Sequence, residues 1–273
     1  MSDLTADQIR TLVREHYAKI STGGGLCAPG CCGTVPPGPS LALGYTEQEL
    51  AAVPDGADLG LGCGNPTAIA ALSPGETVLD LGSGGGFDCF LAARAVGPTG
   101  KVIGVDMTPE MIQRARDNAR RIEATNVEFR LGEIEHLPVA DGTVDAILSN
   151  CVINLSPDKE AVFREALRVL APGGRLAISD VVAIAPIPPE LQTQAAALAG
   201  CIAGAAPLDE LKLLLARVGF VDVEVKIAPR SAEIVDAWLA GASRFIASAT
   251  IEARRPRRTT SEAATCCPPG CCG

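Results

Sequence analysis

The sequence predicts an α/β fold: a doubly wound, mostly parallel sheet with an N-terminal helix and loop extension and a C-terminal α+β addition. Three observations support this prediction. Short apolar strand segments alternate with amphipathic helical segments between residues 76 and 183. These strand segments are apolar throughout, as is typical of parallel strands that helices cover on both faces. A glycine-rich loop directly follows the first of them, where such folds bind their ligands.

The elements follow one another in a regular order. Strands are expected at 76–82, 101–107, 127–133, 144–150 and 175–183, with helices at 87–97, 109–124 and 157–170 between them. Two Ala-rich helices at about 189–203 and 208–218, a strand at 221–229, a helix near Ile234 and a last strand at about 245–253 complete the fold. The tail that follows is basic, then rich in Ser, Thr and Ala, and ends in CCPPGCCG, so it is predicted to be flexible.

The first 66 residues have a different character. A helix is predicted from Thr5 to Ile20, because Thr5 and Gln8 have the spacing of a capping box. One face of this helix carries its apolar and aromatic residues, Ile9, Leu12, Val13, His16, Tyr17 and Ile20, so it is expected to dock on the main domain. Residues 21–66 are rich in Gly, Pro and Cys, with a short helix at 46–52, and long loops of this kind usually serve a site. The predicted division is 1–66, 67–183, 184–254 and 255–273.

Composition excludes several classes of protein. With 273 residues, 47% of them hydrophobic and 20% charged, the chain is too apolar for a disordered protein. A net charge of −9 disfavours nucleic acid and anionic membrane surfaces as partners. The N-terminus lacks the apolar core of a secretory signal, and no apolar run reaches the roughly 20 residues of a membrane span. A cytoplasmic protein is expected, in which the 11 cysteines stay reduced and serve chemistry.

The glycine loop points to a small-molecule cofactor. Gly82, Gly84 and Gly86 lie between a strand and a helix, where a ligand can approach backbone amides. Phe87 occupies the sixth position, where a dinucleotide fingerprint requires glycine, and no Walker A lysine follows. The remaining pattern resembles the class I S-adenosylmethionine (SAM) methyltransferases, which have a Rossmann-like fold. That resemblance implies that the loop holds the methionine part of SAM, with Asp80 nearby.

Further residues extend the expected cofactor site. Asp106 ends the second strand at the spacing where a carboxylate receives ribose hydroxyls. After the third strand, Ile134 would pack on adenine, while Glu135 or its neighbouring amides would meet the adenine edge. Met107 and Asn150 complete the set, and His136 is expected to be solvated or packed. The alternative is that the glycines only form a tight turn and the acids only cap helices.

Four cysteines lie outside the terminal clusters. Cys151 follows the fourth strand, at the edge where open α/β sheets bind ligands. Cys63 is flanked by glycines in DLGLGCGNP, and Cys201 lies in GCIAGA. Taken alone, Cys201 is well explained as a small buried apolar residue, and this is also the expected role of Cys89.

Together with the glycine loop, DLGLGCGNP, SNCVINL and GCIAGA resemble the arsenite SAM methyltransferases. The resemblance implies that Cys63, Cys151 and Cys201 bind trivalent arsenic and that a further N-terminal cysteine acts in the first methylation. Cys27, Cys31 and Cys32 are the candidates in that segment, and Cys32 or Cys31 is preferred.

The chemistry is coherent with these residues. Soft thiolates select soft centres, and arsenic bound by three sulfur atoms keeps a lone pair that is the nucleophile. No general base is required, which suits a sequence with two histidines. Methylation oxidises the arsenic, so thiols must return two electrons, and thioredoxin or glutathione would reduce the resulting disulfide. The C-terminal CCPPGCCG suits either arsenic capture or a zinc site.

Two other functions remain open from the sequence. A SAM methyltransferase of a small organic acceptor, of the quinone or sterol type, would have incidental cysteines and would tolerate their replacement. A thiol-rich metalloid-binding protein would bind its metalloid without turnover.

Overall fold

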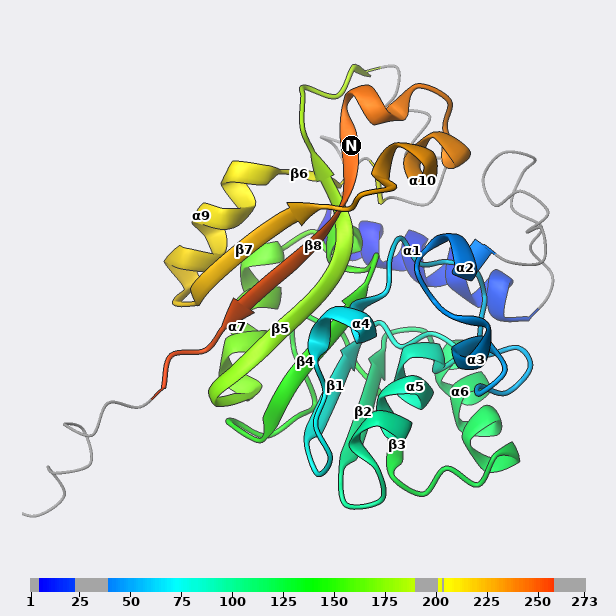
Figure 1. Ribbon diagram of the computed structural model, residues 1–273. Helices are drawn as coiled ribbons and strands as arrows, with labels where there is room; N and C mark the ends of the chain where they lie inside the picture. Colours follow the sequence, from blue (N-terminus) through cyan, green and yellow to red (C-terminus); the bar gives the residue numbers. More distant parts are fainter. Residues whose placement is uncertain (1–4, 23–38, 190–200, 203, 258–273) are drawn as a thin grey trace, which may run out of the picture.

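The computed structural model describes residues 5–22, 39–189, 201–202 and 204–257. Within them one eight-stranded sheet has the order β3-β2-β1-β4-β5-β8-β7, with β6 paired to β5 (Figure 1). The strands are β1 Thr77–Leu81, β2 Lys101–Asp106, β3 Val127–Leu131, β4 Val144–Asn150, β5 Leu170–Ala183, β6 Ala206–Pro207, β7 Val221–Ile227 and β8 Ile246–Arg254. Strands β1 to β5 pair in parallel, whereas β8 runs antiparallel to both β5 and β7. The mostly parallel α/β sheet is confirmed.

Helices cover both faces of this sheet. One face packs against α4 (Pro66–Ala70), α5 (Phe87–Val96) and α6 (Pro109–Arg121), and the other packs against α7 (Lys159–Val169) and α9 (Leu208–Val218). Successive residues of β1 alternate between the two resulting apolar cores: Val78 joins the first and Leu79 the second. Burial on both faces explains why the strand sequences are apolar throughout.

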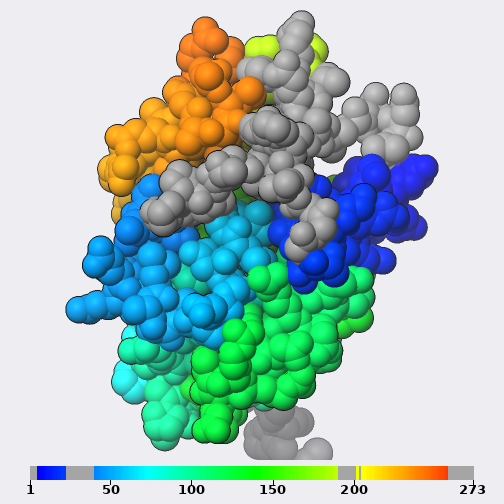
Figure 2. Space-filling model, turned by 90° about the vertical axis from the view of Figure 1, so that its right-hand side faces the viewer, coloured from blue at the N-terminus to red at the C-terminus, as the bar shows by residue number. Residues whose placement is uncertain are grey.

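The N-terminal extension lies across one side of the molecule. Helix α1 (Ala6–Ser21) begins after Thr5 with the predicted capping box to Gln8. No residue of α1 is fully buried, and Leu12 is 55% exposed, so the expectation that Leu12 faces the main domain is wrong. Figure 2 shows α1 in dark blue and the segment with α2 (Pro39–Ala42) and α3 (Glu47–Leu50) in lighter blue on the same face.

The C-terminal part completes the sheet. Helix α10 (Ser231–Trp238) and the short 3-10 helix η2 (Ala242–Arg244) precede β8, and a second 3-10 helix, η1 (Ile153–Leu155), follows β4. Strand β5 begins at Leu170, earlier than expected, because Leu170 pairs with Val144 before a register shift. The predicted helix at 189–203 and the cysteine-rich tail fall largely or wholly outside the described residues. Among the described helices, none is both long and apolar enough to span a membrane.

Candidate functional site: a cavity beside a cysteine cluster

A cavity, partly open to solvent, lies at the carboxyl ends of β1, β2 and β4. The loops after these strands form one wall, and α1 with residues 40–62 forms the other. Eight of the residues expected to act at the site line it: Gly82, Gly84, Asp106, Met107, Ile134, Glu135, Asn150 and Cys151.

The glycine loop leaves polar groups available to a ligand. Gly84 has a φ of +50°, and a Cβ at this residue would meet no atom within 4 Å, so the backbone lies open to the cavity. Its N–H donates to Asp106 Oδ2 at 3.0 Å, and Thr108 N–H donates to Oδ1 at 2.8 Å. Burial raises the pKa of Asp106. The buried Ser83 hydroxyl lines the cavity and has no hydrogen-bond partner among the described residues, so this wall fits a polar ligand.

Two of the expected cofactor residues do not reach the cavity. Asp80 and Gly86 are buried and do not line the cavity. The carboxylate of Asp80 accepts a hydrogen bond from the Cys89 thiol at 3.2 Å, and burial raises its pKa. Cys89 is fully buried in the core, as predicted. The structure therefore gives Asp80 and Gly86 a place in shaping the loop, and their contact with a cofactor stays a prediction.

Asn150 joins the cavity to the segment that carries Cys63. Its Oδ1 accepts the N–H of Cys63 at 2.9 Å, and its Nδ2 donates to the carbonyl of Gly64 at 2.9 Å. A Cβ at Gly62 would lie 2.7 Å from Asn150 Nδ2, so glycine is required for this close approach. The glycines around Cys63 thus bring its loop against the end of β4.

A tyrosine and aspartate pair was missed by the sequence interpretation. The Tyr45 hydroxyl donates to Asp88 Oδ1 at 2.7 Å, and both residues line the cavity. Burial raises the pKa of Asp88 to about 6. Its signal in the sequence is an acid in the first helical turn after the glycine loop, which resembles ordinary helix capping.

The three internal cysteines outside α5 meet at one end of the cavity. The sulfur atoms of Cys63 and Cys151 and a carboxylate oxygen of Asp180 lie within 4.8 Å of one another. The Cys201 thiol donates to the carbonyl of Cys151 at 3.3 Å. Cys151 has a φ of +58°, the left-handed region that non-glycine residues rarely adopt. Strain of this kind is typical of functional positions.

The cysteine cluster has an apolar environment. Its buried neighbours are Val181, Ile202, Val235, Ala242 and Ile246, with Trp238 packed at the edge. Burial raises the pKa of Cys63 to about 11 and also raises that of Cys151. The hydrogen bond with Cys151, followed by burial, raises the pKa of Cys201. All three groups are therefore neutral thiols near pH 7.

Two charged residues beside the cluster were also missed. Asp180 accepts hydrogen bonds from Ile153 N at 3.0 Å and Asn154 Nδ2 at 2.8 Å, and burial raises its pKa to about 6. Lys159, at the start of α7, interacts electrostatically with both Asp180 and Cys201. Asp180 is the one charged residue of the strand segment LAISDVVA, and a lone acid among apolar residues is the signal by which it was identifiable. The expected sites at Cys27, Cys31, Cys32 and the C-terminal cysteines lie outside the described residues.

Comparisons with known proteins identify what this arrangement is similar to. A family model described as "Methyltransferase domain" matches residues 72–234. An arsenite methyltransferase of Halobacterium salinarum is 53% identical over 94% of this chain and 69% of its own length, and that of Aquipseudomonas alcaligenes is 39% identical over 85% and 68%. An arsenic(III) S-adenosylmethionine methyltransferase structure from Chlamydomonas reinhardtii has a TM-score of 0.60 and 35% identity, and covers 83% of this chain and 76% of that one.

Proposed function

This chain belongs to the arsenite methyltransferase family, and we propose that it transfers the methyl group of SAM to trivalent arsenic held by its own cysteines, in arsenic detoxification. One observation carries the proposal: Cys151 lines the cavity and also belongs to the cluster with Cys63 and Cys201. A ligand in the cavity and an atom bound by these sulfurs would therefore be neighbours.

The cavity wall fits SAM at each of its parts. The open backbone at Gly84 and the unpartnered Ser83 hydroxyl suit the methionine part. Asp106 suits the ribose, because each carboxylate oxygen keeps a lone pair beyond its one backbone bond. Buried Ile134 and Glu135 suit adenine. When bound, SAM supplies a methyl group activated by the positive charge of a sulfonium.

Binding of arsenite by the three thiols is balanced without a base. Each arsenic hydroxyl leaves as water with the proton of the thiol that replaces it, so As(OH)3 and three thiols give an As(S)3 centre and three waters. The raised thiol pKa values are compatible with this exchange, because neither reactants nor products are charged. The apolar neighbours exclude competing water from the arsenic lone pair.

The residues of this chain then align the two reactants. With SAM in the cavity, the arsenic lone pair would form the new bond to the methyl carbon, and the electrons of the broken carbon–sulfur bond would stay on sulfur. Asn150 holds the Cys63 loop at the cavity, and Ser179 holds Cys151 through its carbonyl at 2.9 Å. Correct alignment of reactants is worth about 7–11 kcal/mol of the barrier. The transfer therefore depends on fixed positions more than on acid or base groups.

Turnover requires a reductant. The methylated arsenic is formally pentavalent, and two thiolates return it to the trivalent state by joining in a disulfide. Cys31 or Cys32 is the proposed additional thiol in the first methylation, and thioredoxin or glutathione the proposed external reductant. A reducing compartment such as the cytoplasm contains both thioredoxin and glutathione.

The function is tested by incubating the full chain with arsenite, SAM and glutathione. The arsenic species and the S-adenosylhomocysteine formed are then measured. Methylated arsenic in step with S-adenosylhomocysteine is expected. Bound arsenite without turnover would instead support a metalloid-binding protein. Methylation of an organic acceptor that persists in the Cys151→Ser variant would support the quinone or sterol alternative.

A further inference from the structure

Helix α1 reaches the cavity through an arginine that no sequence motif singled out. Arg10 lines the cavity together with Val13 and Tyr17, which follow it at helical spacing. Arg10 Nη2 lies 3.3 Å from Glu135 Oε1, and its Nε lies 3.5 Å from Glu133 Oε2. No residue of the helix is fully buried, and these ion pairs tie it to the loop after β3.

The ion pair with Glu135 is sheltered from solvent. The Glu135 side chain is 5% exposed and that of Arg10 is 16% exposed. A pair of this kind is screened much less than a surface pair. Arg14, one turn further along the helix, lies 3.4 Å from Glu133, but its side chain is 41% exposed and it does not line the cavity. Arg14 therefore provides a control for Arg10: both are arginines of α1 with a glutamate partner, but only Arg10 lines the cavity.

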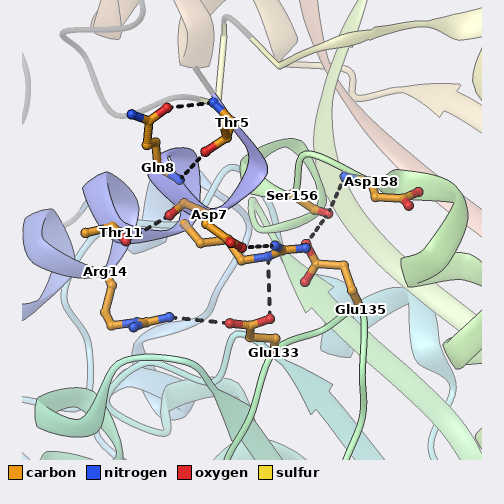
Figure 3. A network of polar contacts seen from close by, with 10 residues as sticks. Thr5, Asp7, Gln8, Thr11, Arg14, Glu133, Glu135, Ser156 and Asp158 are labelled. Atoms are coloured by element: carbon orange, nitrogen blue, oxygen red, sulfur yellow. Dashed lines mark hydrogen bonds and ion pairs between the residues drawn. The ribbon is translucent and has the colours of Figure 1, made fainter. Parts of the chain in front are cut away.

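The hydrogen bonds to Glu135 all end on one of its oxygens. Arg10 Nη2 and Nε donate to Oε1 at 3.3 and 3.4 Å, and Ser156 Oγ donates to the same atom at 2.8 Å. Figure 3 shows Glu135 below Ser156, joined to it by a hydrogen bond, and Glu133 joined to Arg14 of the helix. Among the described residues, no hydrogen bond reaches Oε2. Glu135 lines the cavity, and a carboxylate held through one oxygen keeps the other free to accept from a ligand there.

The geometry points to Arg10 as a positioning residue for nucleobase recognition: with Ser156 it holds Glu135 so that Oε2 receives the exocyclic amine of adenine. This inference rests on the proposed SAM site and adds a determinant of selectivity for the base. A carboxylate accepts from the 6-amino group of adenine but repels the 6-oxo group of hypoxanthine. Helix α1 would then contribute to cofactor selection as well as covering the cavity.

Calorimetry with the full chain tests the inference by comparing S-adenosylhomocysteine with S-inosylhomocysteine, which carries the 6-oxo group. The wild type is expected to prefer the adenine compound by at least about tenfold, the usual effect of a hydrogen bond to a charged group. Arg10→Ala should weaken binding of the adenine compound about tenfold and bring the preference close to unity. Arg14→Ala should change either affinity by less than about twofold.

Three further variants separate positioning from a general effect on folding. Ser156 lies outside α1, so Ser156→Ala should leave the ion pairs of the helix in place. It should still reduce the preference for the adenine compound over the hypoxanthine compound. Arg10→Lys should restore part of it. In a Glu135→Gln background, Arg10→Ala should have little additional effect, because the two residues act through one contact. The KM for SAM should rise in Arg10→Ala while the KM for arsenite stays unchanged.

The outcomes distinguish this inference from the proposed function. A wild type that binds neither compound contradicts both. The role of Arg10 is overturned if the wild type prefers the adenine compound and the Arg10→Ala and Ser156→Ala variants keep the same preference. That result leaves the proposed function standing. An equal loss in Arg10→Ala and Arg14→Ala would show that the helix only covers the cavity.

Discussion

At the carboxyl ends of β1 and β2, backbone amides and carboxylates form the cavity wall, whereas just beyond β4 three thiols lie among apolar side chains. The cofactor end has oriented polar groups on a largely apolar wall: Asp106 and Glu135 each already hold hydrogen bonds that orient them. At the cysteine end the thiols are neutral and their neighbours are mainly aliphatic. The first end suits a polar cofactor with many fixed contacts, and the second suits a single soft atom bound by sulfur.

This difference predicts that substitutions at the cysteine end abolish methylation without affecting SAM binding, and that substitutions at the cofactor end weaken SAM binding without affecting arsenite binding. Cys151→Ser and Cys201→Ser should each abolish methylation of arsenite, because a hydroxyl replaces a sulfur ligand for a thiophilic centre. Binding of SAM measured by calorimetry should stay within about twofold of wild type. Cys89→Ser is the control: Cys89 is buried like Cys151 and more than Cys201, and a serine hydroxyl there would keep the donor to Asp80. Loss of activity in the control as well would mean that the effect comes from folding.

The converse prediction concerns the cofactor end. Asp106→Ala removes the expected ribose acceptor and should weaken SAM binding by about 1–3 kcal/mol, the usual cost of an unpaired polar group. Arsenite binding by the three cysteines should be unchanged. The Asp106→Asn variant keeps an acceptor for one backbone N–H, so its affinity for SAM should fall between those of the wild type and Asp106→Ala. Unchanged affinity for SAM in Asp106→Ala would remove Asp106 from the cofactor site.

The pH dependence of binding affinity should differ between arsenite and zinc at the cysteine end. Because the raised pKa values keep the three thiols protonated, neutral arsenite binds without net release of protons, and its affinity should change by less than about twofold between about pH 7 and 8.5. Asp88 and Asp180, whose pKa values are about 6, stay ionised over that range.

Zinc is the contrasting ligand. It must displace thiol protons, so its affinity should rise by about tenfold per pH unit for each thiol that binds it. Calorimetry in buffers of different ionisation enthalpy measures the protons released in each case. An arsenite affinity that rises steeply with pH would show that the thiols bind as anions formed beforehand.

The smallest effect is expected from the C-terminal cysteines. A flexible tether raises the local concentration of thiols to about the mM range where its length lets it reach. Truncation after Ala264 should therefore leave the rate at saturating arsenite nearly unchanged and lower it only at low arsenite. Assays across arsenite concentrations check this, and a truncated chain that is inactive at saturation would contradict it.

Much of the cofactor end was predictable because it follows from local order. Strand, glycine loop and helix follow one another in the chain, so the positions of Gly82, Gly84 and Asp106 at neighbouring strand ends follow from the parallel sheet. The expectation for Ile134 and Glu135 placed them correctly on the cavity wall. The division of the chain into four parts stays a prediction.

The amino-acid sequence by itself determined the alternation of strands and helices, the capped helix α1 and the identity of the thiols, because periodicity and capping act over a few residues. Only the tertiary structure decided that Cys63 lies beside Cys151, that Asp180 joins them and that Arg10 reaches Glu135. These pairs are distant in the chain and meet through the packing of loops on the sheet edge. No local pattern specifies such contacts, because they depend on side-chain packing and on a glycine that permits close approach at Gly62.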